Sequence, residues 1–216
     1  KLATKDIIGR NIFLCYTKKA NYTGLRKKVT MTDTTWDEKY AREGDPSKVP
    51  SLFLAEQISR LSRGKALDLA MGSGRNSIFL ARNGYEVDAI DYSSVAVGKL
   101  QSFVKEQSLP ITVKQADLTT FQIPDHTYDL IINFNYLERS LIPQIKRGLN
   151  PGGMLLFETY TIEQPRYGRP RNPDYLLKPN ELLSSFSDLH IIYYHERIDH
   201  STEQPQAIAS LLAQKI

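Results

Sequence analysis

Cysteine is almost absent from this sequence, since the 216 residues contain a single one, Cys15. A lone cysteine excludes an internal disulfide and a thiolate metal cluster, and it fits a reducing compartment. No apolar run approaches the roughly 20 residues that a membrane-spanning helix needs, so we expect no membrane partner. The four histidines are scattered without the spacing of a metal site, and we predict no bound metal.

Acidic residues are scarce in only one part of the chain. Residues 1–30 hold eight basic side chains and one acid, Asp6, so this segment carries about +7 and leaves the rest mildly acidic. We predict a basic, poorly ordered extension over 1–30, with organelle targeting and nucleic-acid contact as disfavoured alternatives. Residues 31–216 should form one domain. Its acidic balance argues against a nucleic-acid partner, and we expect a cytoplasmic protein that acts on a small molecule.

Short apolar strands alternate with amphipathic helices from residue 31 onward. Each connection between strands is long enough for a helix, which is typical of a parallel, doubly wound sheet with right-handed crossovers. Asn83-Gly84 is a helix stop signal. The expected helices lie over 34–43, from Pro50, from 75 to Asn83, around 95–104 and over 139–149. The expected strands lie over 66–70, 85–91, 111–117, 128–134 and 154–161.

The pattern changes after about residue 160. A loop rich in proline and arginine, "EQPRYGRPRNPDY", precedes a short helix over 178–186. Two strands follow over 189–199 and 206–216, without room for a helix between them, so they should form an antiparallel pair at the sheet edge. The predicted fold is α/β: a doubly wound, mostly parallel seven-stranded sheet with an antiparallel C-terminal edge pair.

The stretch "LDLAMGSGRNSIFLA" carries the first sign of function, because two glycines lie between a strand and a helix. Ligands of such folds bind at the carboxyl ends of the strands, and Gly72 and Gly74 would let a ligand approach the backbone closely. Amides at the start of the next helix favour a negative group such as a carboxylate. Asp68 would place an acid near a ligand cation, and Asp91 could accept hydrogen bonds from ribose hydroxyls.

Other nucleotide sites also use glycine-rich loops. In a nicotinamide-dinucleotide site a third glycine would stand at Ser77, and a Walker loop would have a Lys-Ser/Thr pair after the glycines. The region after strand 128–134, "NFNYLERS", lacks the paired prolines of a DNA-adenine methyltransferase motif. These departures argue against a nicotinamide-dependent oxidoreductase and against an enzyme that methylates nucleic acid.

An ordered series of four motifs narrows the choice further. The string "ALDLAMGSGRNSIFLARNGYEVDAIDYS", followed by "QADL", "YDLIINF" and "LNPGGMLLFETY", resembles the class I S-adenosylmethionine-dependent methyltransferases. With "WDEKY" ahead of it, the chain is similar to the small tellurite-resistance-type branch of that family. The resemblance covers residues 36–216. It implies S-adenosyl-L-methionine as cofactor and S-adenosyl-L-homocysteine as product.

The resemblance also implies roles for individual residues. The loop and Asp68 would hold the methionine part of the cofactor, and Asp91 the ribose, with Tyr92 beside the adenine. The side chains after strand 128–134 would face the sulfonium, and two aromatic residues near the N-terminus would form a lid. The implied cofactor-binding residues are Trp36, Tyr40, Asp68, Ala70, Gly72, Ser73, Gly74, Asn76, Asp91, Tyr92, Asp117, Leu118, Asn133 and Asn135.

Each carboxylate also has a plainer interpretation, as a helix cap or a loop acid, and the two aromatic residues could simply pack. The family usually has glycine at Ala70. The alanine methyl and Met71 could crowd the loop, but alanine is small, so we expect cofactor binding to survive in a weakened form. No compelling general base is visible; Tyr136, Glu138 and Tyr160 are positional candidates. A missing base favours a soft acceptor such as a thiol or chalcogen species. A non-catalytic domain that binds S-adenosylmethionine stays open as an alternative.

Overall fold

The computed structural model describes residues 33–42, 44, 49–201 and 203–216, and the side chains from Trp36 onward. The predicted basic extension over 1–30 lies outside the described residues, so the division of the chain at residue 30 stays a prediction. No helix in the described ranges is long and apolar enough to cross a membrane.

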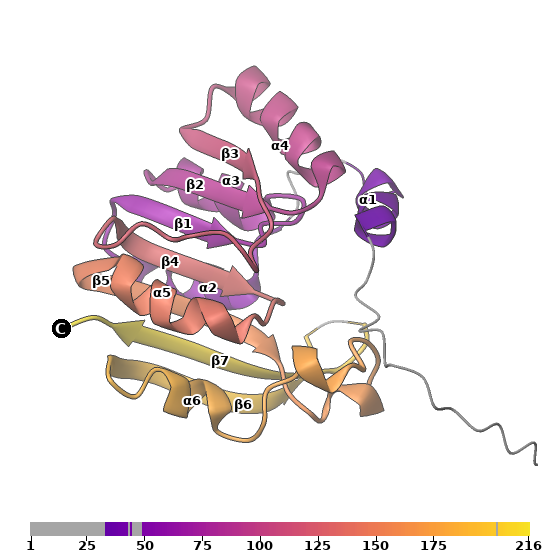
Figure 1. Cartoon of the computed structure of the whole chain (residues 1–216), viewed down its shortest axis with the longest axis vertical. Coiled ribbons are helices and arrows are strands. Elements are labelled where there is room, and N and C mark those ends of the chain that lie inside the picture. The colour runs from indigo at the N-terminus through magenta and orange to yellow at the C-terminus, as the bar shows by residue number, and fades with distance from the viewer. Residues whose placement is uncertain (1–32, 43, 45–48, 202) are drawn as a thin grey trace, which may run out of the picture. The chain divides into compact units, whose positions relative to one another are not determined.

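A seven-stranded sheet with the strand order β3-β2-β1-β4-β5-β7-β6 forms the framework (Figure 1). Strands β1 to β5 are parallel, whereas β7 pairs antiparallel with both β5 and β6. The predicted doubly wound sheet with an antiparallel edge pair is therefore confirmed. The strands are β1 (Lys65–Leu69), β2 (Glu86–Asp91), β3 (Ile111–Gln115), β4 (Tyr128–Phe134), β5 (Leu149–Tyr160), β6 (His190–Asp199) and β7 (Gln206–Gln214).

Helices cover both faces of the sheet: α5 and α6 lie on the face toward the viewer in Figure 1, and α2 and α3 lie behind it. The α-helices of the described residues are α1 (Asp33–Arg42), α2 (Leu52–Gln57), α3 (Arg75–Arg82), α4 (Ser94–Gln107), α5 (Ile142–Gly148) and α6 (Glu181–Ser185). Short 3-10 helices are η1 (Ile58–Arg60), η2 (Arg139–Leu141), η3 (Gln164–Arg166) and η4 (Pro173–Tyr175). Asn83 caps α3, as the stop signal predicts.

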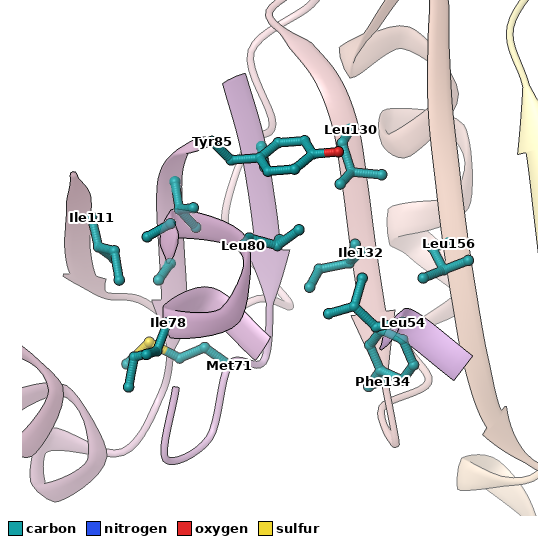
Figure 2. Close-up of a cluster of buried hydrophobic side chains, with 14 of the residues drawn as sticks. Leu54, Met71, Ile78, Leu80, Tyr85, Ile111, Leu130, Ile132, Phe134 and Leu156 are labelled. Atoms are coloured by element: carbon teal, nitrogen blue, oxygen red, sulfur yellow. The ribbon is translucent and has the colours of Figure 1, made fainter. Parts of the chain in front are cut away.

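Apolar side chains on the two faces of the sheet form two buried clusters. The first packs α2 and α3 against the sheet through residues such as Leu54, Leu80 and Ile132 (Figure 2). The second packs α5 and α6 against the other face and includes Ile145 and Phe186. Each such side chain stabilises the fold by about 1.5–3 kcal/mol when fully buried. The clusters therefore hold the strand ends, and the polar residues on them, in fixed positions.

Two segments differ from the sequence-based expectations. The helix expected over 139–149 is split into η2 and α5, and Pro143 lies in the first turn of α5, where a missing N–H costs nothing. The strand expected over 154–161 begins earlier, at Leu149, so residues 150–153 lie inside β5, although Gly152 keeps a left-handed φ of 78°. A register shift between Tyr128 and Leu130 accommodates this irregularity between β4 and β5.

Candidate cofactor site

The loop between β1 and α3 turns through three residues with left-handed backbone: Ala70 (φ 55°), Gly72 (φ 57°) and Gly74 (φ 81°). Both glycines are also closely approached by side chains. A Cβ on Gly72 would lie 2.9 Å from the Tyr40 hydroxyl, and one on Gly74 would lie 2.6 Å from the Leu100 methyl groups. The loop needs glycine at these two positions for conformation and for space.

Ala70 occupies the position where the family usually has glycine, and its backbone adopts the left-handed conformation that glycine favours. An alanine in the left-handed region costs about 1–2 kcal/mol, which the surrounding loop has to offset. Met71 points its side chain away from the loop. Its side chain is buried in the first cluster close to Ile78 (Figure 2), and its amide donates to the Ile90 carbonyl at 3.0 Å.

Asp68 is a fully buried carboxylate within β1. Its Oδ2 accepts a hydrogen bond from the Ser77 hydroxyl at 2.5 Å. Burial raises the pKa of Asp68 to about 7, and the negative charge of Asp91 adds to the rise, while the Ser77 bond and the Arg75 charge oppose it. The raised pKa means that no nearby cation fully stabilises the charged form of this carboxylate. A cationic ligand group beside Asp68 would stabilise it.

Asp91, the last residue of β2, ties the glycine loop to the start of α4. Its Oδ2 accepts the Gly72 N–H at 2.8 Å, and its Oδ1 accepts the Ser93 N–H at 2.9 Å. Burial raises the pKa of Asp91, and these two amide bonds oppose the rise. Each carboxylate oxygen accepts one of these bonds and keeps a further lone pair for a ligand hydroxyl.

The residues that follow β2 and β3 differ in their exposure to solvent. Asp117 is exposed, and its Oδ1 accepts the Thr119 N–H at 2.9 Å and the Thr119 hydroxyl at 2.7 Å. Leu118 is buried and packs in the second cluster. Tyr92, after β2, is 41% exposed and so remains accessible to an aromatic ligand. Asp117 and Tyr92 can therefore contact a ligand, whereas Leu118 is part of the core.

The residues at the end of β4 and directly after it are held by hydrogen bonds within the protein. Asn133 is buried, and its Nδ2 donates to the Tyr136 carbonyl at 2.7 Å. Asn135 is exposed in a left-handed conformation (φ 58°), and its N–H donates to the Glu158 carbonyl at 2.9 Å. Glu138 accepts from the Ser140 amide and hydroxyl, and thereby caps η2. The Asn135 side chain therefore remains accessible, whereas Asn133 is engaged within the protein and Glu138 uses its Oε1 to cap η2.

Two tyrosines lie in the electrostatic field of the site. Burial raises the pKa of Tyr136, and the negative charges of Glu138, Asp117 and Asp91 raise it further. Burial also raises the pKa of Tyr160, against the opposing charge of Arg75. Both hydroxyls therefore stay protonated at neutral pH and can donate hydrogen bonds, but they are poor general bases.

Arg75 is a site residue that the sequence analysis missed. It is the first residue of α3, and its charge acts on Asp68 and on Tyr160. Its position directly after the second loop glycine was the available signal, since a cation there reinforces an anion-binding helix start. Ser73 is half-buried in the loop. The Asn76 Oδ1 accepts the Ser51 N–H at 2.9 Å, which joins α3 to the start of α2.

Helix α1 supplies the two aromatic residues predicted as a lid. Trp36 and Tyr40 stack with their ring centroids 6.0 Å apart, and Lys39 lies over both rings. Tyr40 approaches the loop at Gly72, as described above. The described residues contain no group of three or more His, Cys, Asp or Glu side chains that could hold a metal ion.

The sheet order, the glycine loop after β1 and the carboxylate at the end of β2 together define the class I S-adenosylmethionine-dependent methyltransferase fold. The solved structures agree: the crystal structure of TehB from Haemophilus influenzae matches with a TM-score of 0.67 and 23% identity, covering 85% of this chain and 67% of that chain. Residues 31–207 match the tellurite resistance protein TehB family. The chain belongs to this family.

Two curated relatives show the extent of the likeness. A probable S-adenosyl-L-methionine-dependent methyltransferase TehB from Haemophilus influenzae (strain 10810) is 26% identical over 216 residues, covering 93% of this chain and 68% of the relative. Hemagglutinin 1 from Eikenella corrodens is 26% identical over 159 residues, covering 69% of this chain and 52% of the relative. The chain thus spans only about half to two thirds of the length of these relatives.

Proposed function

We propose that this protein transfers a methyl group from S-adenosylmethionine to a small-molecule acceptor and releases S-adenosylhomocysteine. The observation that carries the proposal is the pair of buried carboxylates, Asp68 and Asp91, on adjacent strands beside one glycine loop. Asp68 is a buried acid with a pKa near neutrality, which suits a cationic ligand group. Asp91 keeps lone pairs for hydroxyl donors. A cofactor with an ammonium group, a sulfonium and a ribose fits both.

The remaining parts of the cofactor have matching partners along the same edge. Asp91 would accept from the ribose hydroxyls, and the unused Oδ2 of Asp117 would accept from the adenine amino group. Arg75 and the first amides of α3 would bind the methionine carboxylate, because a guanidinium and a helix start both favour an anion. Asp68 would neutralise positive charge on the methionine part.

We infer the class of methyl acceptor from the properties of the three candidate bases, Tyr136, Glu138 and Tyr160. The sulfonium of S-adenosylmethionine supplies an electrophilic methyl group, so the protein mainly has to align the acceptor and exclude water. Such alignment can lower a barrier by about 7–11 kcal/mol. Tyr136 and Tyr160 stay protonated and are poor bases, and the Glu138 Oε1 caps η2 by accepting from Ser140. We propose that the acceptor is already nucleophilic, as a thiolate or a chalcogen anion is, and that the tyrosines orient it by donating hydrogen bonds.

Calorimetry with S-adenosylmethionine, S-adenosylhomocysteine and NAD tests the cofactor. The Asp91→Ala variant should weaken binding of the first two by about 1–3 kcal/mol, the cost of charge-assisted hydrogen bonds. Asp88→Ala is the matched control, because Asp88 lies on the same strand but contacts Lys65 and Tyr128 instead. Equal affinities in the two variants, or binding of NAD alone, would contradict the proposal.

A second assay separates the enzyme from a silent binding domain. Mass spectrometry should detect S-adenosylhomocysteine and a methylated product when thiol or chalcogen acceptors are supplied, and much less with amine or alcohol acceptors. Faster turnover with amines would contradict the soft-acceptor proposal. Binding without turnover on any acceptor would support the non-catalytic alternative.

A further inference from the structure

Helix α1 is attached to the start of α4 through one side chain, Asp37. The Ser93 hydroxyl donates to Asp37 Oδ1, and the Ser94 hydroxyl donates to Asp37 Oδ2 at 3.1 Å. The Val95 N–H donates to Asp37 Oδ1 at 3.4 Å. A carboxylate at this place also interacts favourably with the positive end of the α4 dipole. The Ser93 hydroxyl lowers the pKa of Asp37, so the side chain is charged at neutral pH.

A second contact between the same two helices lies in the last turn of α1. The Lys99 ammonium, on α4, donates to the Tyr40 carbonyl at 2.6 Å and to the Ala41 carbonyl at 3.4 Å. It therefore binds carbonyls of the last turn of α1, where a cation is favourable. These two contacts fix the part of α1 that carries Tyr40, whose hydroxyl lies close to Gly72.

Ser93 connects this attachment to the cofactor site. Its backbone N–H donates to Asp91, the proposed ribose ligand, while its hydroxyl donates to Asp37. The same hydroxyl accepts the Ala96 N–H at 3.2 Å and so caps α4. One residue thus positions the ribose carboxylate and the helix that carries Trp36 and Tyr40.

We propose that Asp37 is a positioning residue that holds α1 over the cofactor site by binding the start of α4. The need for such a contact is physical: α1 has ten residues, and a helix of that length is marginal in water without tertiary contacts. The cofactor part of this inference rests on the proposed function, whereas the docking of α1 does not. With α1 held in place, the bound adenosyl group would be covered and would dissociate more slowly.

The chain offers a direct probe of this docking, because Trp36 on α1 is its single tryptophan. The experiment measures acrylamide quenching and anisotropy of Trp36 fluorescence without cofactor, and then the affinity and dissociation rate of S-adenosylhomocysteine. It compares the wild-type chain with Asp37→Ala, Asp37→Asn and Glu38→Ala. Glu38 is the matched control, since it is an exposed acid on the same helix and makes no hydrogen bond within the described part of the chain. Far-UV circular dichroism confirms that each variant is folded.

Asp37→Ala should raise the quenching constant of Trp36 and weaken S-adenosylhomocysteine binding by about three- to tenfold, mainly through faster dissociation. Asp37→Asn keeps one acceptor oxygen for Ser93 and should lie between the wild type and Asp37→Ala. Unchanged Trp36 quenching in Asp37→Ala, or an equal change in Glu38→Ala, overturns the inference. If the wild type binds no S-adenosylhomocysteine, the proposed function fails, and the Trp36 measurement alone still decides the docking of α1.

Discussion

Cofactor binding should release a proton from Asp68, and the release can be calculated. Burial raises the pKa of this carboxyl to about 7 in the free protein. A cationic group placed beside it stabilises the charged form and returns the pKa toward its ordinary value of 3.8. Binding should therefore release about 0.8 proton at pH 6.5, where most of Asp68 is protonated, and about 0.1 at pH 8. Affinity should rise with pH up to about 7 and then level off.

The same shift has a consequence for stability without cofactor. The pKa of Asp68 is higher in the folded than in the unfolded protein. Its contribution to the free energy of unfolding is therefore fully present below about pH 4 and is lost as the pH rises through about 7. A shift of about three units corresponds to about 4 kcal/mol between these limits. Asp68→Asn should flatten this slope and should be more stable than the wild type at pH 8, because its amide stays neutral and its oxygen can still accept from Ser77.

Isothermal titration calorimetry with S-adenosylhomocysteine in buffers of different ionisation enthalpy measures the proton release between pH 5.5 and 8. The Asp68→Asn variant supplies the baseline, since the ligand's own amino group titrates equally in both proteins. A release in the wild type that equals the baseline would refute the reasoning, as would an uptake of protons. Urea denaturation at the same pH values checks the stability slope independently.

Three further predictions concern the loop and its surroundings. Gly74→Ala should destabilise the fold by about 2–4 kcal/mol, combining left-handed strain with a clash against Leu100; urea denaturation measures this, and a loss below about 1 kcal/mol would count against the described loop. Ala70→Gly should change stability by less than about 1 kcal/mol, because relief of strain is offset by a freer unfolded chain, and the same assay checks it. Arg139→Gln removes the ion pair with Glu181 and bonds to two loop carbonyls, so proteolysis within 173–177 should accelerate, and equal cleavage rates would contradict this.

Much of the framework could be predicted from the sequence because it depends on local patterns. Alternating apolar strands and amphipathic helices indicate a doubly wound sheet, and the absence of a helix between the last two strands indicates an antiparallel pair. Paired glycines between a strand and a helix mark a ligand loop wherever the rest of the chain folds. The place of Asp91 beside the glycine loop could be predicted for the same reason, since the carboxyl ends of parallel strands meet at one edge of the sheet.

Tertiary structure decided what depends on contacts between distant residues. The near-neutral pKa of Asp68 comes from burial, which no local pattern reports. The side chain of Met71 lies in the core, although its residue belongs to the glycine loop. Asp37 reads as an ordinary helix acid in the sequence, and its partner Ser93 is 56 residues away. The sequence alone determined which elements form and where the glycine loop lies, because both depend on local patterns. Only the folded chain decided which charges are buried and which helix lies beside that loop, because both depend on contacts between distant residues.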